Sequence, residues 1–349
     1  MSAAAPRPGL RAVEPYAAPQ LDVRARLNTN ESPYPLPDAF REDLGQALMS
    51  LDLHRYPARE AEELRTRLAD LHGHSPEGTW CANGSNEVIQ QLLQAYGGPT
   101  RRALAFEPTY ALHSRIAWVT STEVVRRDLT EPWVLGTWDV ENSGASGADV
   151  VFVCSPNNPT GNAQPLAIIE RFAEKTRGLV IVDEAYGEFC GTSAIGLLER
   201  YPNLVVVRTF SKAFALAGAR LGYCLAAPAV VEDLRRVRLP YHLSSLAQAA
   251  GIAALDHRDE ALAIVDGIRR QRDRLLEELP GLGAEVFPSD ANFVLFRPPK
   301  PAAEVWQGLL ERGVLVRDFS TVIHGCLRVT AGTPEEVDRF LSALEEVLA

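Results

Sequence analysis

Three short runs of apolar, mostly β-branched residues constrain the fold of this chain more than any other feature. They are VVFVCS at 150–155, LVIVDEA at 179–185 and LVVVRTF at 204–210. Near-continuous apolar runs of this length suit strands that are buried on both faces, and longer helical or loop stretches separate them. Between about residues 60 and 235, the sequence therefore predicts an α/β unit built on a mostly parallel sheet.

The segments on either side of this unit differ from it in composition and in predicted secondary structure. Residues 1–30 are rich in Pro and Ala and lead into LNTNESPYPLP, whose prolines forbid regular helix or central strand. After Pro240 come a long helical stretch at 261–279 and short strands at 292–296 and 327–330. We predict an N-terminal arm over 1–30, a large domain over 31–240 and a smaller α+β domain over 241–349, which suits a chain of 349 residues.

Composition narrows the class of ligand. The chain is 46% hydrophobic and 23% charged, with a net charge of −10, which disfavours binding to nucleic acid or to an anionic membrane surface. Any anionic ligand must be held by local positive groups. Five scattered cysteines and seven histidines show no metal-ligand spacing, so we expect no metal site. Without a signal peptide or a long apolar run, we expect a soluble cytoplasmic protein.

A phosphate-binding helix start is predicted in ANGSNEVIQQLLQAYGG at 82–98. Apolar residues follow a helical spacing after a turn of small residues, which places the start of the helix at Ser85 or Asn86. Free backbone amides and the positive end of the helix dipole suit a phosphate there. The alternative is that Ser85 or Asn86 only caps the helix.

Polar residues also follow the buried strands. SPNNPTG at 155–161 and VDEAY at 182–186 fall at carboxyl ends of strands, where open α/β sheets bind ligands. Asp183 is costly to bury without a cationic partner, although it could instead cap the next helix. SPNNPTG could likewise be an ordinary loop of turn-forming residues.

The third run leads into RTFSKAFALAGARLG at 208–222, which places Lys212 just past a strand and Arg220 eight residues later. Most lysines are solvated surface groups, so Lys212 alone indicates little. The order is informative: a phosphate cradle, a strand-end Asn, a strand-end Asp followed by Tyr, and then Ser-Lys with a later Arg all belong to one sheet.

In this order the sequence resembles the fold-type I, class-II aminotransferases that depend on pyridoxal 5'-phosphate, and within them the histidinol-phosphate aminotransferase family. The resemblance runs from about Asn28 to the C-terminus. Its motifs are LNTNESP, HRYP at 54–57, ANGSNE, FEPTY at 106–110, SPNNPTG, VDEAYGEF, TFSKAFALAGARLGY, LPYHLSS at 239–245, PSDANFVLF at 288–296 and LRVTAG at 327–332.

The resemblance implies a role for each matching residue. Lys212 would hold the cofactor as a Schiff base, Asp183 would pair with the pyridine nitrogen, and the phenolic oxygen would contact Asn158 and Tyr186. The remaining implied cofactor residues are Ser85, Asn86, Thr209, Ser211 and Arg220 at the phosphate, Tyr110 stacked on the ring, and Tyr56 reaching the site of the neighbouring subunit of a homodimer. The implied substrate residues are Tyr16, Asn30, Arg317 and Arg328.

The implied reaction is transamination of L-histidinol phosphate with 2-oxoglutarate, which gives imidazole-acetol phosphate and L-glutamate in histidine biosynthesis. The residue types suit it, because a carboxylate favours a protonated pyridine, a desolvated lysine is a good nucleophile, and an arginine fork matches phosphate. Arg317 could instead form a surface ion pair with Asp318.

The sequence disfavours two alternative functions and leaves two others open. Neither GxxxxGK[ST] nor GxGxxG occurs, which disfavours a nucleotide-binding enzyme, and a cofactor-sensing regulator would need an added DNA-binding module. An aromatic amino acid aminotransferase and a threonine-phosphate decarboxylase share the cofactor and fold, and only the substrate pocket can separate them from the first reading.

Overall fold

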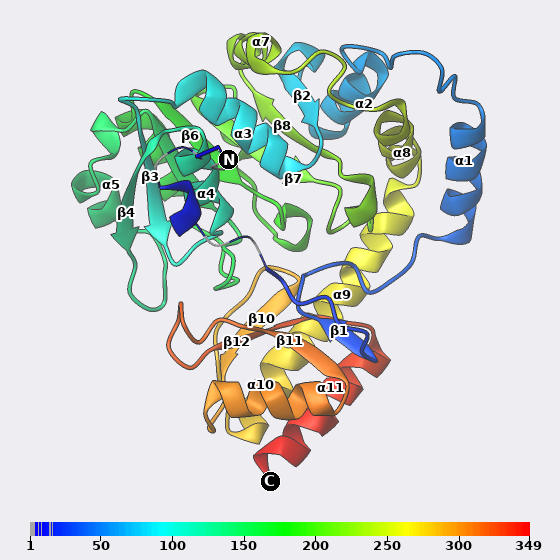
Figure 1. Ribbon diagram of the computed structural model, residues 1–349, viewed down its shortest axis with the longest axis vertical. Helices are drawn as coiled ribbons and strands as arrows, with labels where there is room; N and C mark the ends of the chain where they lie inside the picture. The colour runs from blue at the N-terminus through cyan, green and yellow to red at the C-terminus, as the bar shows by residue number, and fades with distance from the viewer. Residues whose placement is uncertain (1–3, 6, 8, 14, 16) are drawn as a thin grey trace.

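Two sheets lie one above the other in the computed structural model, which describes residues 4, 5, 7, 9–13, 15 and 17–349 (Figure 1). The upper sheet has seven strands in the order β2-β8-β7-β6-β5-β3-β4. The five strands from β7 to β4 run parallel, whereas β8 is antiparallel to both of its neighbours. The strands are β2 (Thr79–Ala82), β3 (Arg102–Glu107), β4 (Glu123–Asp128), β5 (Val150–Cys154), β6 (Leu179–Asp183), β7 (Leu204–Thr209) and β8 (Gly222–Ala226).

The three apolar runs contain the central strands of this sheet, β5, β6 and β7, and every residue of these strands is buried. Helices cover both faces, which explains why these strands carry no polar face. On one face α3 and α7 pack through Val88, Ile89, Leu92, Val231 and Leu234. The predicted α/β class with a mostly parallel sheet is confirmed.

The helices around the upper sheet come from most of the chain. They are α1 (Asp38–Met49), α2 (Glu62–His72), α3 (Ser85–Tyr96), α4 (Leu112–Val119), α5 (Thr137–Asn142), α6 (Leu166–Lys175), α7 (Pro228–Val237) and α8 (Ser245–Asp256). The short 3-10 helices are Leu10–Ala12, Pro76–Gly78, Ala145–Gly147, Gly187–Phe189, Ala194–Leu197, Ala217–Ala219 and Leu279–Leu282.

The lower sheet joins the two ends of the chain. Its order is β1-β11-β12-β10-β9, with β1 parallel to β11 and the other pairs antiparallel. The strands are β1 (Ala25–Leu27), β9 (Glu285–Val286), β10 (Phe293–Arg297), β11 (Val314–Asp318) and β12 (Leu327–Thr330). The sequence analysis placed residues 25–27 in the N-terminal arm, but they form strand β1 of this sheet. The reason is that the side chains of Ala25 and Leu27 are buried beside β11.

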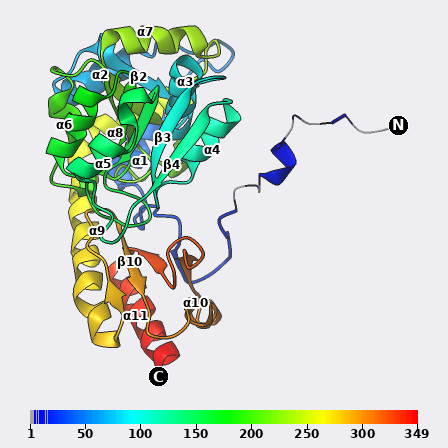
Figure 2. The same cartoon turned by 90° about the vertical axis from the view of Figure 1, so that its left-hand side faces the viewer.

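One long helix connects the two tiers. Helix α9 (Arg258–Glu278) runs from the upper tier down one side of the molecule, and α10 (Ala302–Glu311) and α11 (Pro334–Leu348) complete the lower tier (Figure 2). The sequence placed a domain boundary at residue 240, but α8 still packs against α1 and α2. Small residues such as Ala250 and Gly251 allow this close packing. Because α8 belongs to the upper tier, the chain passes to the lower tier along α9, after the predicted boundary. Among the described helices, none combines the length and the continuous apolar character that a membrane-spanning helix needs.

Candidate active site

A cavity of about 950 Å³ lies where the carboxyl ends of the parallel strands face the lower sheet. It collects residues that are far apart in sequence, because parallel strands bring their carboxyl ends to one edge. Of the residues predicted from the sequence, it is lined by Asn30, Ser85, Asn86, Tyr110, Asn158, Asp183, Tyr186, Thr209, Ser211, Lys212, Arg220, Arg317 and Arg328.

Two predicted residues are not among the lining residues. Tyr56 is 80% exposed and stacks on Tyr241, with 4.5 Å between ring centroids. Tyr56 is predicted to reach the active site of the neighbouring subunit. The structure contains one chain, so this contact stays a prediction. Tyr16 lies outside the described residues.

One end of the cavity is a cup for an anion. Helix α3 begins at Ser85, and its cap position is Gly84, so the alternative that Ser85 or Asn86 serves as the cap is wrong. Arg220 Nη1 donates to Ser211 Oγ at 3.4 Å, and Thr209 Oγ1 donates to the same oxygen at 3.0 Å. The first turn of α3, two hydroxyls and one guanidinium therefore converge, as a phosphate requires.

The cup depends on two glycines. Gly84 has φ +84°, and a Cβ there would lie 2.8 Å from Arg220 Nη2. A Cβ on Gly222 would lie 2.2 Å from the backbone nitrogen of Ser85. Only glycine lets the backbones of β8 and α3 approach this closely and leaves room for the arginine.

Asp183 is buried at the end of β6 and has a partner that the sequence analysis missed. His113 Nε2, on α4, lies 2.8 Å from Asp183 Oδ2, and the histidine is fully buried and stacked on Phe152 at 4.7 Å. Asp183 Oδ1 accepts the Ala185 amide at 3.1 Å, which closes a turn rather than capping a helix. The signal in the sequence was an otherwise unexplained histidine three residues after Tyr110, facing a buried acid that needs a donor.

A hydrogen-bond network links the two sheets across the cavity. Asn30 Nδ2 and Asn158 Nδ2 lie 3.0 and 3.3 Å from the Tyr186 hydroxyl oxygen and donate to it. Because the oxygen accepts from both amides, the hydroxyl proton is left for an acceptor in the cavity. Burial raises the pKa of Tyr186 to about 12, so this proton is retained at neutral pH.

Lys212 lies between the anion cup and the lower sheet. Its Nζ donates to the backbone carbonyl of Thr29 at 2.9 Å, a contact that the sequence analysis did not predict. Desolvation in the cavity, followed by the nearby charges of Arg328 and Arg220, lowers the pKa of Lys212 to about 8. At pH 7 about a tenth of this amine is therefore neutral and nucleophilic, far more than at the ordinary lysine pKa.

The lower sheet contributes two arginines that face each other in the register of β11 and β12. Arg328 is 5% exposed, its guanidinium lies 4.9 Å from the Phe293 ring centroid, and Nη1 donates to Asn158 Oδ1. Arg317 Nη1 donates to the Ala17 carbonyl at 3.1 Å, and its side chain forms no ion pair with the described side chain of Asp318. Both arginines line the cavity and can bind substrate anions.

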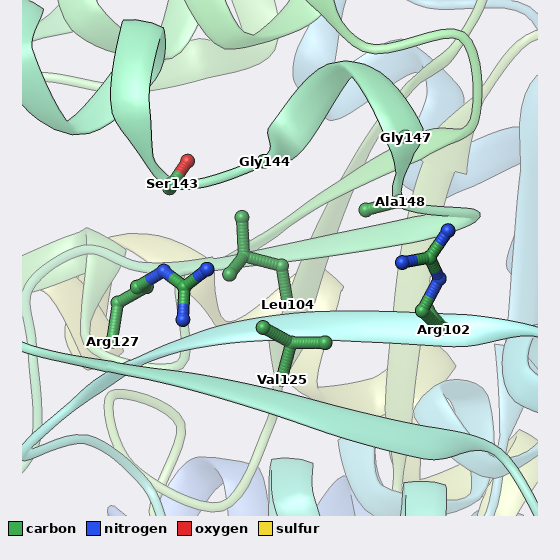
Figure 3. Close-up of a pocket in the computed structure, with 8 residues that line it drawn as sticks. All are labelled: Arg102, Leu104, Val125, Arg127, Ser143, Gly144, Gly147 and Ala148. Carbon is green, nitrogen blue, oxygen red and sulfur yellow. The ribbon is translucent and has the colours of Figure 1, made fainter.

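A second pocket lies away from this site, between β3, β4 and the Ser143–Ala148 segment (Figure 3). Its volume is about 70 Å³, which is small for a cofactor, because ligand sites span roughly 300–1,000 Å³. Arg102 and Arg127 lie at opposite ends of it with Leu104 between them (Figure 3). The larger cavity is therefore the candidate active site.

Comparisons with known proteins agree with this geometry. A family model described as aminotransferase class I and II matches residues 25–344. Histidinol-phosphate aminotransferase from Frankia casuarinae is 50% identical over 358 residues, covering 98% of this chain and 90% of that protein. The similarity therefore extends over nearly the full length of this chain and over most of that relative.

Solved structures show the same fold. Histidinol-phosphate aminotransferase from Sinorhizobium meliloti, in complex with pyridoxal-5'-phosphate, has a TM-score of 0.83 at 25% identity, covering 93% of this chain and 91% of that chain. L-threonine-O-3-phosphate decarboxylase from Porphyromonas gingivalis has a TM-score of 0.80 at 26% identity, covering 92% and 98%. Because two reactions share the fold, the fold alone does not select the substrate.

Proposed function

The chain belongs to the class I and II aminotransferases, and from this membership we propose that it transfers the amino group of L-histidinol phosphate to 2-oxoglutarate, with pyridoxal 5'-phosphate as cofactor. The products are imidazole-acetol phosphate and L-glutamate, a step of histidine biosynthesis. The observation that carries the proposal is that one cavity holds the Lys212 amine, the buried Asp183 carboxylate and the anion cup.

The cavity offers a partner to each polar part of the cofactor. The cup of Ser85, Asn86, Thr209, Ser211 and Arg220 would hold the phosphate. Asp183 would meet the ring nitrogen, Asn158 and Tyr186 the phenolic oxygen, and Tyr110 a face of the ring. Lys212 would hold the group covalently through its amine.

When bound, the cofactor supplies an electron-accepting ring for the electron pair left by the broken Cα–H bond of the substrate. The residues of the chain prepare this step. Asp183, which His113 contacts at 2.8 Å, would favour a proton on the ring nitrogen by charge pairing. The Lys212 amine would accept the proton from the substrate Cα. The Tyr186 hydroxyl would donate to the phenolic oxygen.

The substrate assignment rests on the close relatives and on the two cavity arginines. Histidinol phosphate carries a phosphate and no α-carboxylate, whereas glutamate carries two carboxylates, so one pocket must bind anions of different shape in succession. Arg328 and Arg317 provide two planar forks for these anions, and Asn30 lines the same cavity. The family resemblance assigns Tyr16 to the substrate as well.

We also propose a homodimer with shared active sites. Two segments, 49–56 and 239–241, meet where Tyr56 stacks on Tyr241, and they carry exposed apolar side chains: Met49 at 90%, Leu53 at 65% and Leu239 at 75%. Exposed apolar side chains gathered in this way favour a subunit interface. We place the enzyme in the cytoplasm, which suits its five free cysteines.

The decisive experiment compares kcat/KM for the first half-reaction with histidinol phosphate, phenylalanine and phosphothreonine. We expect histidinol phosphate to be preferred, transfer to 2-oxoglutarate to follow, and Lys212→Ala to abolish turnover. Phenylalanine equal to or better than histidinol phosphate would replace the substrate assignment with an aromatic aminotransferase. Carbon dioxide release from phosphothreonine would indicate the decarboxylase instead.

A further inference from the structure

A buried ion cluster lies beneath the turn that carries Asp183 and Tyr186. Arg208, the next-to-last residue of β7, donates from Nε and Nη2 to Glu184 Oε2 at 3.0 and 2.6 Å, and from Nη1 to Glu188 Oε1 at 2.9 Å. The three side chains are between 3% and 8% exposed. We call Arg208, Glu184 and Glu188 the Arg208 cluster.

The cluster joins the two loops that carry the cofactor residues. Glu184 follows Asp183, Glu188 lies two residues after Tyr186, and Arg208 precedes Thr209. Side chains alternate along a strand, so Asp183 and Thr209 reach the cavity while their neighbours point to the opposite side. The turn over 183–188 and the loop that leads to Lys212 are therefore tied together from behind.

The backbone is shaped to admit the guanidinium. A Cβ on Gly187 would lie 2.7 Å from Arg208 Cζ, so any larger residue would push the turn away from the arginine. Glu184 also accepts from Ser193 Oγ at 2.8 Å and from the Ala194 amide at 2.6 Å. The turn thus rests directly on the planar guanidinium group.

A second arginine holds the same turn from the connecting helix. Arg269, on α9, donates to the backbone carbonyls of Glu188 and Phe189 at 3.0 Å each, and to Cys190 at 3.4 Å. Its side chain is 33% exposed. Because α9 runs from the upper tier to the lower tier, this contact ties the turn to the helix that supports the lower sheet.

The charges in the cluster do not balance. One guanidinium faces two carboxylates, and Glu188 Oε2 is buried without a hydrogen-bond partner in the described structure. Burying such groups is costly, and well-packed apolar residues often stabilise a fold as well or better. Apolar residues cannot supply the directed hydrogen bonds of the rigid Arg208 fork, which donates three to Glu184 and Glu188 and a fourth to Ser193 Oγ.

We propose that the Arg208 cluster and Arg269 are positioning residues, which set the orientation of Asp183 and Tyr186 toward the cofactor. The inference rests on the proposed cofactor site. The cluster acts through the turn and touches neither the cofactor nor the substrate. Its loss should weaken cofactor binding and slow turnover more than it raises KM, because misplaced groups lose the alignment that the reaction requires.

The test measures the binding of pyridoxal 5'-phosphate to apoprotein by visible absorption, together with kcat, KM and the thermal midpoint. Arg208→Lys keeps a positive charge and removes the fork, and Arg269→Gln removes the contact from α9. We expect each to weaken cofactor binding by about ten- to a hundredfold and to lower kcat. Arg65→Lys is the matched control, because Arg65 is also buried and donates to the backbone carbonyls of Thr79 and Pro76 away from the cavity.

The outcomes are distinguishable. Wild-type protein that does not bind the cofactor overturns the proposed function itself. Cofactor affinity and kcat at the wild-type level in Arg208→Lys and Arg269→Gln, or an equal loss in Arg65→Lys, overturns the positioning role. Should Arg208→Lys fail to fold, Arg269→Gln decides alone, since its side chain is partly exposed and its loss leaves the buried ion pairs in place.

Discussion

At the scale of single residues, the active-site lysine is tuned by its surroundings. The cavity wall and two arginines lower the pKa of Lys212 to about 8, and Glu31 acts in the opposite direction. The ordinary value for lysine is higher because the ammonium is normally hydrated. Lys212 is therefore ready to react without a dedicated general base, which explains why a lysine surrounded by cations is useful here.

This tuning predicts a pH dependence. The neutral fraction of Lys212 rises as the pH increases through about 8, so the rate at which apoprotein takes up pyridoxal 5'-phosphate should rise there and then level off. The unfolded chain keeps its lysine proton at higher pH than the folded chain does. From this group, the free energy of unfolding of the apoprotein should therefore increase with pH above about 8.

The measurement is stopped-flow absorbance across the pH range, with Arg328→Met as the comparison. Removing that cation should move the midpoint of the uptake profile upward, since Arg328 is the largest electrostatic contribution after desolvation. A wild-type midpoint near the ordinary lysine value would contradict the assigned environment.

A second residue-scale prediction concerns His113, the only described hydrogen-bonding side chain opposite Asp183 Oδ2. His113→Phe should keep the stack on Phe152 but leave the carboxylate without its donor. A hydrogen bond to a charged group contributes roughly 1.5–3 kcal/mol, so kcat should fall by about ten- to a hundredfold.

His113→Gln is the control, because its amide can restore a donor to Asp183. We expect it to recover part of kcat while KM changes little in either variant. Equal activity of wild type and His113→Phe would mean that Asp183 needs no support from α4.

At the scale of elements, the approach of β8 to α3 forms the anion cup. Gly222→Ala places a Cβ 2.2 Å from the Ser85 nitrogen and 2.5 Å from the Gly84 carbonyl carbon. These atoms are backbone, so the start of α3 must move. We predict a stability loss of about 1–3 kcal/mol and weaker binding of the cofactor phosphate.

Calorimetry and a cofactor titration measure both effects. Gly196→Ala is the matched control, since a Cβ there meets nothing within 4 Å. If Gly222→Ala binds the cofactor as tightly as wild type, the close contact between β8 and α3 is not what shapes the cup.

At the scale of the whole molecule, each active site takes groups from both tiers of one chain. The cavity lies between the upper and lower sheets, and the Asn28–Glu31 segment crosses between them. Arg328 Nη2 donates to the Asn28 carbonyl at 2.9 Å, and Thr330 Oγ1 donates to Asn30 Oδ1 at 3.0 Å. Movement of the lower tier would therefore reshape the substrate end of the cavity directly.

The proposed dimer predicts complementation between inactive subunits. A Lys212→Ala chain and a Tyr56→Ala chain, mixed in equal amounts, should form hybrids in which one of the two sites has both native groups. Half of the dimers are then hybrids with one working site each, so recovery should approach about a quarter of wild-type activity.

Exchange of subunits is verified with differently tagged chains, and each variant alone provides the baseline. No recovery after complete exchange would show that Tyr56 serves its own subunit or neither.

The sequence by itself determined the parallel sheet and the place of the chemistry. Runs such as LVIVD suit strands that are buried on both faces, and a parallel sheet gathers at one edge the residues that follow its strands. The sequence alone therefore places Asp183, Asn158 and Lys212 at one edge of the sheet. Motif order then pointed to the family, which the comparisons confirmed.

Only the tertiary structure decided which distant groups complete the site. The pairing of His113 with Asp183, the contact of Lys212 with the Thr29 carbonyl, and the entry of β1 into the lower sheet join residues separated by 70, 183 and nearly 300 positions. No local pattern records such contacts, because they depend on how separate elements pack. The sequence showed that the buried carboxyl group of Asp183 needs a hydrogen-bond partner. The packing of α4 against the sheet makes His113 that partner.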